Sequence, residues 1–468
     1  MNIVRTVFRG FLFAGLKRNM LLSLTQSIVG LCTALAAYRI LVNETSIEVL
    51  GLWTLINGIV ALIRIADVSG GSGLNRLVAV AVLKTDGPAP VIDTVTTFIA
   101  VLYALVALIA IVPFQTLAAA SIDGEYHALS ESLVVWVLGT LLLAVVSTSQ
   151  LNALDGIRRA DLHALIQITG FLIYLATAAI LIPVHNVFGI AMAQVVQFLF
   201  VIVGARLFLV QMIPKLRVFP TFFSLCELRA ALVYGAKLQL ANVAQLIFLG
   251  PGLRLVVNYA GGLGFVAIFD VAQKLTSAVS ALAAAATRPI VPEFSRSNEL
   301  DLESRNQLYV RLTRVQVPSA AIAFIGSCCV GPLVAWFVFG SVPYAFLSTF
   351  AGLSLGWFVF TATMPSLMLA RGAGILRWNI IGQWAITILG VALGIISAAL
   401  GSNFIGAAIG LALVLGSLIQ LTGNTRVYKL PITSVFATRF TIVSTLLFLI
   451  SLGLLVAVES MNYCRVCD

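Results

Sequence analysis

Predominantly apolar runs of about 20 residues recur along the whole chain, each long enough to cross the roughly 30 Å hydrocarbon core of a bilayer. The runs are continuous rather than alternating, which excludes a transmembrane β-barrel. Charged residues make up only 10% of the chain, whereas a soluble domain is usually about one quarter charged. The sequence therefore predicts an all-α polytopic membrane protein.

The apolar runs suggest about thirteen membrane spans, so we expect roughly 12–14 transmembrane helices. The predicted spans are 19–41, 49–66, 91–113, 131–153, 162–183, 187–210, 229–257, 262–290, 310–339, 344–369, 375–400, 403–424 and 437–458.

Basic residues alternate between the predicted loops in a way that sets the orientation of the chain. With the N-terminus in the cytoplasm, the even-numbered loops and the adjoining helix ends carry nearly all the Lys and Arg. These residues include Arg64, Arg76, Arg158, Arg159, Lys215, Arg217, Arg311, Arg314, Arg377 and Arg426. The odd-numbered loops, such as "SIDGEYHALSE" and "YAGG", carry none. The net charge of +10 is therefore mostly a topology signal, and it needs no nucleic acid to explain it. Contact with anionic lipids at the cytoplasmic face is a side effect of the same charge.

Two similar segments, "RILVN" (Arg39–Asn43) and "RLVVN" (Arg254–Asn258), close the first and seventh predicted helices at the same face. Transporters are often built from repeated helical halves with the substrate site at their interface. We therefore expect a six-helix lobe at residues 1–214, a second six-helix lobe at 215–430, a central cavity, and an extra helix with a tail at 431–468.

Ionisable residues inside the bilayer cost roughly 2.5–3.5 kcal/mol on insertion scales and normally face protein or a water-filled cavity. The candidates are Arg39, Asp67, Lys237, Arg254, Asp270 and Lys274. Four cations against two anions favour a cavity for an anionic substrate, because desolvated phosphates need paired cations.

Asp270 and Lys274 are four residues apart and share one helix face. Either they form an internal ion pair, or Lys274 lines a cavity while Asp270 sets its charge or titrates. Lys237 and Arg254 share another predicted helix but lie roughly 100° apart on it. The segment "GPG" (250–252) should break that helix, which would let both side chains turn inward. Arg39 and Arg254 lie near helix ends, where they either snorkel to the interface or flank a common cavity mouth.

The stretch "IRIADVSGGSGLNRLVAVAV" (63–82) places Asp67 and several glycines at the predicted cytoplasmic end of the second helix. It is no dinucleotide fingerprint, since Arg76 stands where glycine is needed. We interpret Asp67 as the end of a moving helix and residues 74–84 as an interfacial helix. Arg64 and Arg76 would then meet a phosphate at the cytoplasmic entrance.

Two segments resemble a known family. "LGLWTLINGIVALIRIADVSGGSGLNRLVA" and "GFVAIFDVAQKLTSAVSALAAAATRPIVPEFSR" are similar to the second and eighth helices of Wzx-type O-antigen and exopolysaccharide flippases. These belong to the multidrug/oligosaccharidyl-lipid/polysaccharide (MOP) exporter superfamily, which also contains the MATE transporters. Asp270, Lys274, Pro289 and Pro292 fall on the pattern of the eighth helix.

The resemblance implies a flippase that moves undecaprenyl-pyrophosphate-linked oligosaccharide across the bacterial inner membrane by alternating access. Arg39, Lys237, Arg254 and Lys274 would bind the substrate, and Asp67 and Asp270 would couple transport to H⁺ or Na⁺ or gate it. No catalytic residue, metal or cofactor is expected. The alternatives are an ion-coupled multidrug exporter of the same superfamily, which would require an acidic cavity, and a membrane-embedded polymerase or glycosyltransferase. The latter needs paired acids or a histidine base, whereas the histidines here are scattered.

Overall fold

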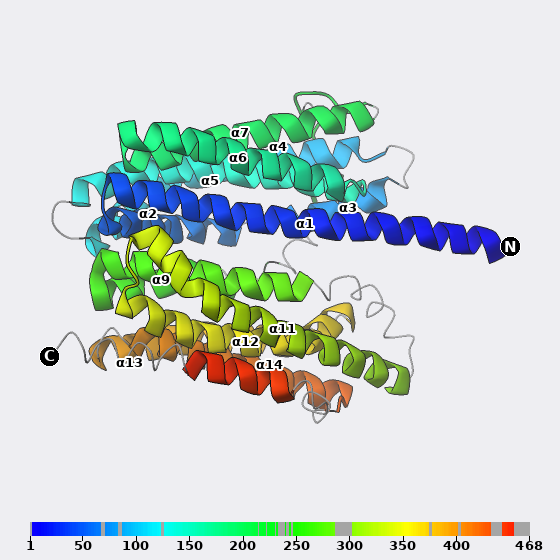
Figure 1. Cartoon of the computed structure of the whole chain (residues 1–468). Helices are drawn as coiled ribbons and strands as arrows, with labels where there is room; N and C mark the ends of the chain where they lie inside the picture. Colours follow the sequence, from blue (N-terminus) through cyan, green and yellow to red (C-terminus); the bar gives the residue numbers. More distant parts are fainter. Residues whose placement is uncertain are drawn as a thin grey trace. The chain divides into compact units, whose positions relative to one another are not determined.

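The computed structural model is helical throughout the part of the chain that it describes (Figure 1). The described residues are all those outside 1, 67–70, 83–86, 123–125, 214, 221, 230, 233–238, 240–242, 245–246, 286–301, 374–376, 401–403, 432–441 and 454–468.

The first half of the described chain contains α1 (Asn2–Glu44), α2 (Ile47–Val60), η1 (Ala61–Ala66), α3 (Gly71–Ala81), α4 (Ala89–Ser121), α5 (His127–Gly156), α6 (Ala160–His185) and α7 (Val187–Met212). The second half contains η3 (Phe248–Gly252), α9 (Leu253–Ala285), α11 (Leu302–Phe339), α12 (Tyr344–Ala373), α13 (Arg377–Leu400) and α14 (Ile405–Tyr428).

Eleven of the described helices are long and apolar enough to cross a membrane, which makes this a multi-pass membrane protein. They correspond to the predicted spans except at two places. The predicted span 229–257 lies largely outside the described residues, and of 437–458 the structure describes residues 442–453 as a shorter apolar helix. The helix expected at 74–84 is present as α3.

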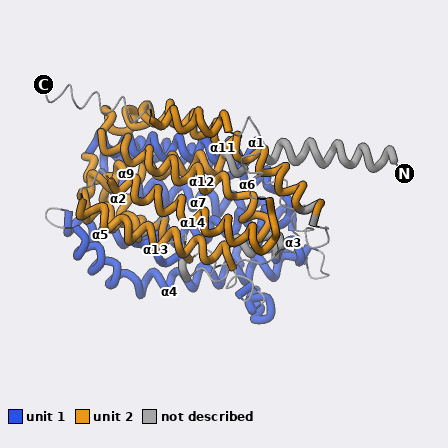
Figure 2. Tube along the Cα trace, turned by 90° about the horizontal axis from the view of Figure 1, so that it is seen from below, with its two compact units in different colours: residues 1–45, 59–242 blue, residues 46–58, 243–468 orange. Residues whose placement is uncertain are grey.

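The chain divides into two compact units, drawn in different colours in Figure 2. Unit 1 comprises residues 1–45 and 59–242, and unit 2 comprises residues 46–58 and 243–468. Most of α2 therefore belongs to unit 2, although its neighbours in the sequence belong to unit 1. The lobe boundaries proposed from the sequence stay a prediction.

Unit 1 is a bundle in which α6 packs along α1 and α7, while α5 packs against α4 and α7. The short helix α3 lies against the end of α5, where Gly156 leaves it room. A Cβ atom on Gly156 would lie 2.6 Å from Cβ of Val78, so α3 docks only because that side chain is missing.

Unit 2 is built around α14, which packs along α12 and α13, and around α9, which contacts α11, α12 and α13. At the α12–α14 crossing, Gly352 and Gly356 face Gly406 and Gly410, and the two backbones touch. A Cβ atom on Gly356 would lie 2.8 Å from the carbonyl oxygen of Gly410. Small residues four apart on both helices are typical of close helix packing in lipid, where there is no hydrophobic force between helices.

Two glycines bend the chain beside the candidate site. At Gly250, within the π-helical turn η3, the backbone leaves helical geometry (φ −89°, ψ −115°), so "GPG" does interrupt the helix as predicted. At Gly262 the backbone turns with φ 73° and ψ −174° inside α9. A positive φ suits glycine because it has no Cβ atom. The segments before and after Gly262 therefore form a hairpin.

Candidate functional site

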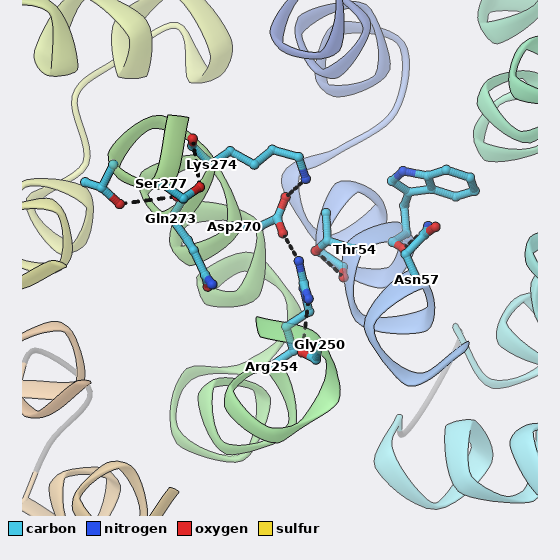
Figure 3. Close-up of polar contacts among 11 residues, drawn as sticks. Thr54, Asn57, Gly250, Arg254, Asp270, Gln273, Lys274 and Ser277 are labelled. Atoms are coloured by element: carbon cyan, nitrogen blue, oxygen red, sulfur yellow. Dashed lines mark hydrogen bonds and ion pairs between the residues drawn. The ribbon is translucent and has the colours of Figure 1, made fainter. Parts of the chain in front are cut away.

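Three charged side chains of unit 2 meet in the α9 hairpin, and we call them the charge cluster: Arg254, Asp270 and Lys274. Nη2 of Arg254 donates to Oδ1 of Asp270 at 2.5 Å, and Nζ of Lys274 donates to Oδ2 at 2.5 Å. Figure 3 shows the carboxylate held between the two cations. One carboxylate thus balances two cations, and the cluster keeps a positive charge in excess.

The hairpin explains how residues far apart in the sequence meet. Arg254 and Asp270 lie equally far from Gly262, one on each arm. At 1.5 Å per residue both lie about 12 Å from the turn. Arg254 is therefore engaged inside unit 2 by its pairing with Asp270. The ion pair between Asp270 and Lys274 that the i, i+4 spacing allows is present.

The portion of α2 in unit 2 forms one wall of the cluster. Gly51 lies against the backbone of Leu263, and Gly58 lies against Arg254. A Cβ atom on Gly58 would lie 2.6 Å from Cδ of Arg254 and 3.3 Å from its Nη1. Thr54, buried on the same helix, lies beside the cluster in Figure 3. The guanidinium of Arg254 also donates through Nη1 to the carbonyl of Gly250 at 3.0 Å.

Burial differs sharply within the charge cluster. The side chain of Asp270 is 1% exposed, whereas those of Arg254 and Lys274 are 15% and 34% exposed. The carboxylate is thus covered by the cations that bind it. The two cations remain partly exposed. Partly exposed cations that lie side by side suit the binding of an anionic group through charge-assisted hydrogen bonds.

The other sequence candidates are not brought to this cluster by anything the structure describes. Asp67 and Lys237 lie outside the described residues, and the side chain of Arg76 on α3 is likewise not described. Arg64, at the end of η1, is exposed, and Arg39 is half-buried near the end of α1. Both belong to unit 1.

A second buried ion pair, absent from the sequence candidates, lies in unit 1. Nη2 of Arg206 on α7 donates to Oδ1 of Asp93 on α4 at 2.5 Å, and both side chains are about 95% buried. Arg206 also donates to the carbonyls of Arg217 and Val218, at 2.6 and 3.1 Å. It thus fastens the segment that follows α7 onto the first turns of α4, where Thr94 accepts from the backbone of Ser224.

A signal for this pair exists in the sequence. Asp93 and Arg206 each fall inside a predicted span (91–113 and 187–210), so the cost of burying their charges should have marked them as partners. Neither residue was among the candidates named from the sequence.

The sequence matches no family model and no curated protein, but solved structures share its fold. An inward-facing multidrug resistance MATE family transporter of the MOP superfamily aligns with a TM-score of 0.70 at 18% identity. The alignment covers 86% of this chain and 98% of the transporter. The lipid II flippase MurJ, in an inward closed conformation, aligns with a TM-score of 0.65 at 12% identity over 96% of this chain and 99% of MurJ.

A third similar structure is a MOP superfamily transporter from Pyrococcus furiosus, described as having a binding pocket of reverse polarity. It aligns with a TM-score of 0.58 at 16% identity over 91% of this chain and 96% of that protein. The chain therefore has the fold of MOP superfamily transporters, which confirms the fold class expected from the sequence. At these identities the likeness defines the fold and leaves the cargo to be argued from the residues of this chain.

Proposed function

We propose that this chain is a flippase that translocates undecaprenyl-pyrophosphate-linked oligosaccharide across the bacterial inner membrane by alternating access. The observation that carries the proposal is the charge cluster, in which two partly exposed cations cover one buried carboxylate. A pyrophosphate offers several oxygens to paired cations, and charge-assisted hydrogen bonds of this kind are roughly twice as strong as neutral ones. The fold shared with a lipid II flippase supports the same class of cargo.

In the proposed cycle Asp270 holds the site closed between substrates. It keeps Arg254 and Lys274 in place and offsets part of the cost of their burial. An arriving pyrophosphate competes for the same two cations. Uptake of H⁺ by Asp270, or binding of Na⁺ to it, would weaken its hold and release both cations to the substrate. Release of the ion after translocation would restore the cluster and expel the phosphate.

The remaining sequence candidates keep their proposed roles. Arg39 and Lys237 are further substrate-binding cations, Asp67 is a second coupling or gating acid, and Arg64 and Arg76 form the cytoplasmic entrance. The N-terminus is proposed to face the cytoplasm. Reporter fusions to the loops "SIDGEYHALSE" and the α5–α6 turn test this orientation, since only the former should be periplasmic.

The decisive experiment follows the lipid-linked glycan by leaflet in a strain whose own copy is deleted. Complementation by Arg254→Ala or Lys274→Ala should leave the glycan in the cytoplasmic leaflet and abolish surface polysaccharide, with wild-type protein level. The matched control is Arg426→Ala, which removes an exposed arginine from the end of α14 and should complement fully. Full complementation by both cluster variants would refute the proposal.

A multidrug exporter is the second candidate, because a MATE family multidrug transporter shares the fold. The two functions differ in the charge that the site must offer. A cationic drug would be repelled by Arg254 and Lys274 and would require Asp270 to be free of them. The test is uptake of a cationic dye into proteoliposomes. This alternative would be favoured if the Lys274→Ala variant still took up the dye and the Asp270→Asn variant did not.

A further inference from the structure

A groove of about 690 Å³ opens on unit 1. The turn between α5 and α6 forms its polar side, with Gly156, Arg158 and Arg159. Its apolar side is formed by Val82, just after α3, and by Met212 and Ile213 at the end of α7. We call this the α5–α6 groove. One wall therefore carries cations and the other offers only apolar atoms.

Arg158 adopts a backbone conformation that arginine rarely takes. Its φ is 63°, in the left-handed region. The backbone N–H of Arg158 donates to the carbonyl of Asp155 and that of Arg159 to the carbonyl of Leu154, which together make a Schellman motif at the end of α5. Glycine is the usual residue at this position, and other residues there cost of order 1 kcal/mol or more. Arginine thus stands at the groove in a backbone conformation that carries a local penalty.

The two arginines of the turn differ in their partners. Arg159 pairs with Asp161, with Nε to Oδ1 at 3.0 Å and Nη2 to Oδ2 at 3.3 Å, and its Nη1 lies 3.8 Å from Sδ of Met212. Arg158 is exposed and makes no ion pair with any residue that the structure describes. The groove is therefore lined by one arginine that an ion pair holds in place, Arg159, and by one exposed arginine, Arg158.

The segment after α7 extends the same amphipathic character. Lys215 and Arg217 are exposed, and Phe219 and Leu225 beside them are 78% and 75% exposed. Arg206 holds this segment in place through two backbone carbonyls. Exposed basic residues together with large exposed apolar ones are typical of a surface that lies at the headgroup level of a membrane.

From this arrangement we infer that the α5–α6 groove binds an anionic phospholipid, with the headgroup phosphate on Arg158 and an acyl chain along Val82, Met212 and Ile213. Free phosphate would use the cation but none of the apolar wall. A zwitterionic lipid would also offer a phosphate, but its choline cation would offset the attraction of that phosphate to Arg158, so a headgroup of net negative charge is favoured. The predicted orientation places the groove at the cytoplasmic leaflet, where anionic lipids attract basic residues by about 1 kcal/mol each. The inference does not depend on the cargo of the transporter.

The test is competition between phosphatidylglycerol and phosphatidylcholine for the full-length protein in mild detergent, with bound lipid counted by native mass spectrometry. Arg158→Gly removes the charge and leaves a residue that suits the left-handed backbone. It should lower the preference for phosphatidylglycerol about fivefold while the thermal midpoint stays equal or rises. Arg158→Lys should retain most of the preference.

Two further variants distinguish binding of the lipid in the groove from a general electrostatic attraction of anionic lipid to the protein. Arg426→Gln removes an exposed arginine of unit 2 and should leave the preference unchanged. Val82→Trp fills the apolar side and should displace phosphatidylglycerol without any change in charge. An unchanged preference in Arg158→Gly, or an equal loss in Arg426→Gln, would overturn the inference. Displacement of the lipid by millimolar inorganic phosphate would show an anion site that takes free phosphate, and would overturn the lipid assignment.

Discussion

Arg254 and Asp270 lie at equal distances along the chain on either side of Gly262, and they meet in an ion pair across the α9 hairpin. The turn thus places the two opposite charges, one on each helical arm, at the same distance from Gly262. Lys274, one helical turn beyond Asp270, completes the cluster from the same arm. A change in the length of either arm would separate the charges by several ångströms.

The first prediction concerns the shared carboxylate. Asp270→Asn should destabilise the protein by up to about 3 kcal/mol, because it leaves two partly buried cations without their counter-charge. Adding Lys274→Met should restore part of this loss by removing one of them. The measurement is a double-mutant cycle on thermal unfolding in detergent. Strictly additive effects of the two substitutions would show that the residues do not interact.

The second prediction concerns the wall formed by α2. Gly58→Ala should push Arg254 away from Asp270, since the new Cβ atom would lie 2.6 Å from Cδ of Arg254. We expect export to fall several-fold, with a smaller loss of thermal stability than Asp270→Asn causes. Gly326→Ala on α11 is the control, because a Cβ atom there meets open space. That variant should export normally and gain up to about 1 kcal/mol from better helix propensity.

The third prediction concerns the segment after α7. Arg206→Met should release the carbonyls of Arg217 and Val218 and leave Asp93 without its partner. Trypsin cleavage after Lys215 and Arg217 should then become about tenfold faster, because two charge-assisted hydrogen bonds to the backbone are lost. Asp93→Asn keeps those bonds and should accelerate cleavage less. Equal rates in the wild type and Arg206→Met would contradict the fastening role of Arg206.

The fourth prediction concerns a buried amide pair in unit 2. Nδ2 of Asn424 on α14 donates to Oδ1 of Asn379 on α13 at 2.9 Å and to the carbonyl of Ser366 on α12 at 3.4 Å. Asn424→Leu should cost about 1–3 kcal/mol, since it leaves the amide oxygen of Asn379 unsatisfied. In the Asn424→Leu variant, the further substitution Asn379→Leu should lower the stability by less than it does in the wild type. An equal loss of stability in both backgrounds would show that the two residues act separately.

The helices were predictable because a backbone that crosses lipid must satisfy its own hydrogen bonds, and a helix does this within a single apolar run of spanning length. The break at "GPG" and the turn near Gly262 were also readable, since proline and glycine act on the backbone wherever they stand. The pair of Asp270 and Lys274 follows from helical spacing alone. All these features depend on residues close together in the sequence.

The features that the sequence did not reveal depend on contacts between distant residues. Arg254 joins Asp270 only because the hairpin closes tightly, and the spacing of the charges does not specify that. Asp93 and Arg206 pair across two helices that are far apart in the chain. A charged residue inside a predicted span is expected to have a partner, but a single sequence does not identify that partner among several candidates.

The assignment of residues 46–58 to unit 2 has a consequence for biogenesis. During synthesis α2 reaches the membrane long before α9, so the face with Gly51 and Gly58 has no partner until the second half of the chain is inserted. A fragment that ends at residue 242 would contain α2 without the surface on which it packs. The first half of the chain thus supplies a helix to unit 2, and unit 2 is complete only when both halves have been translated.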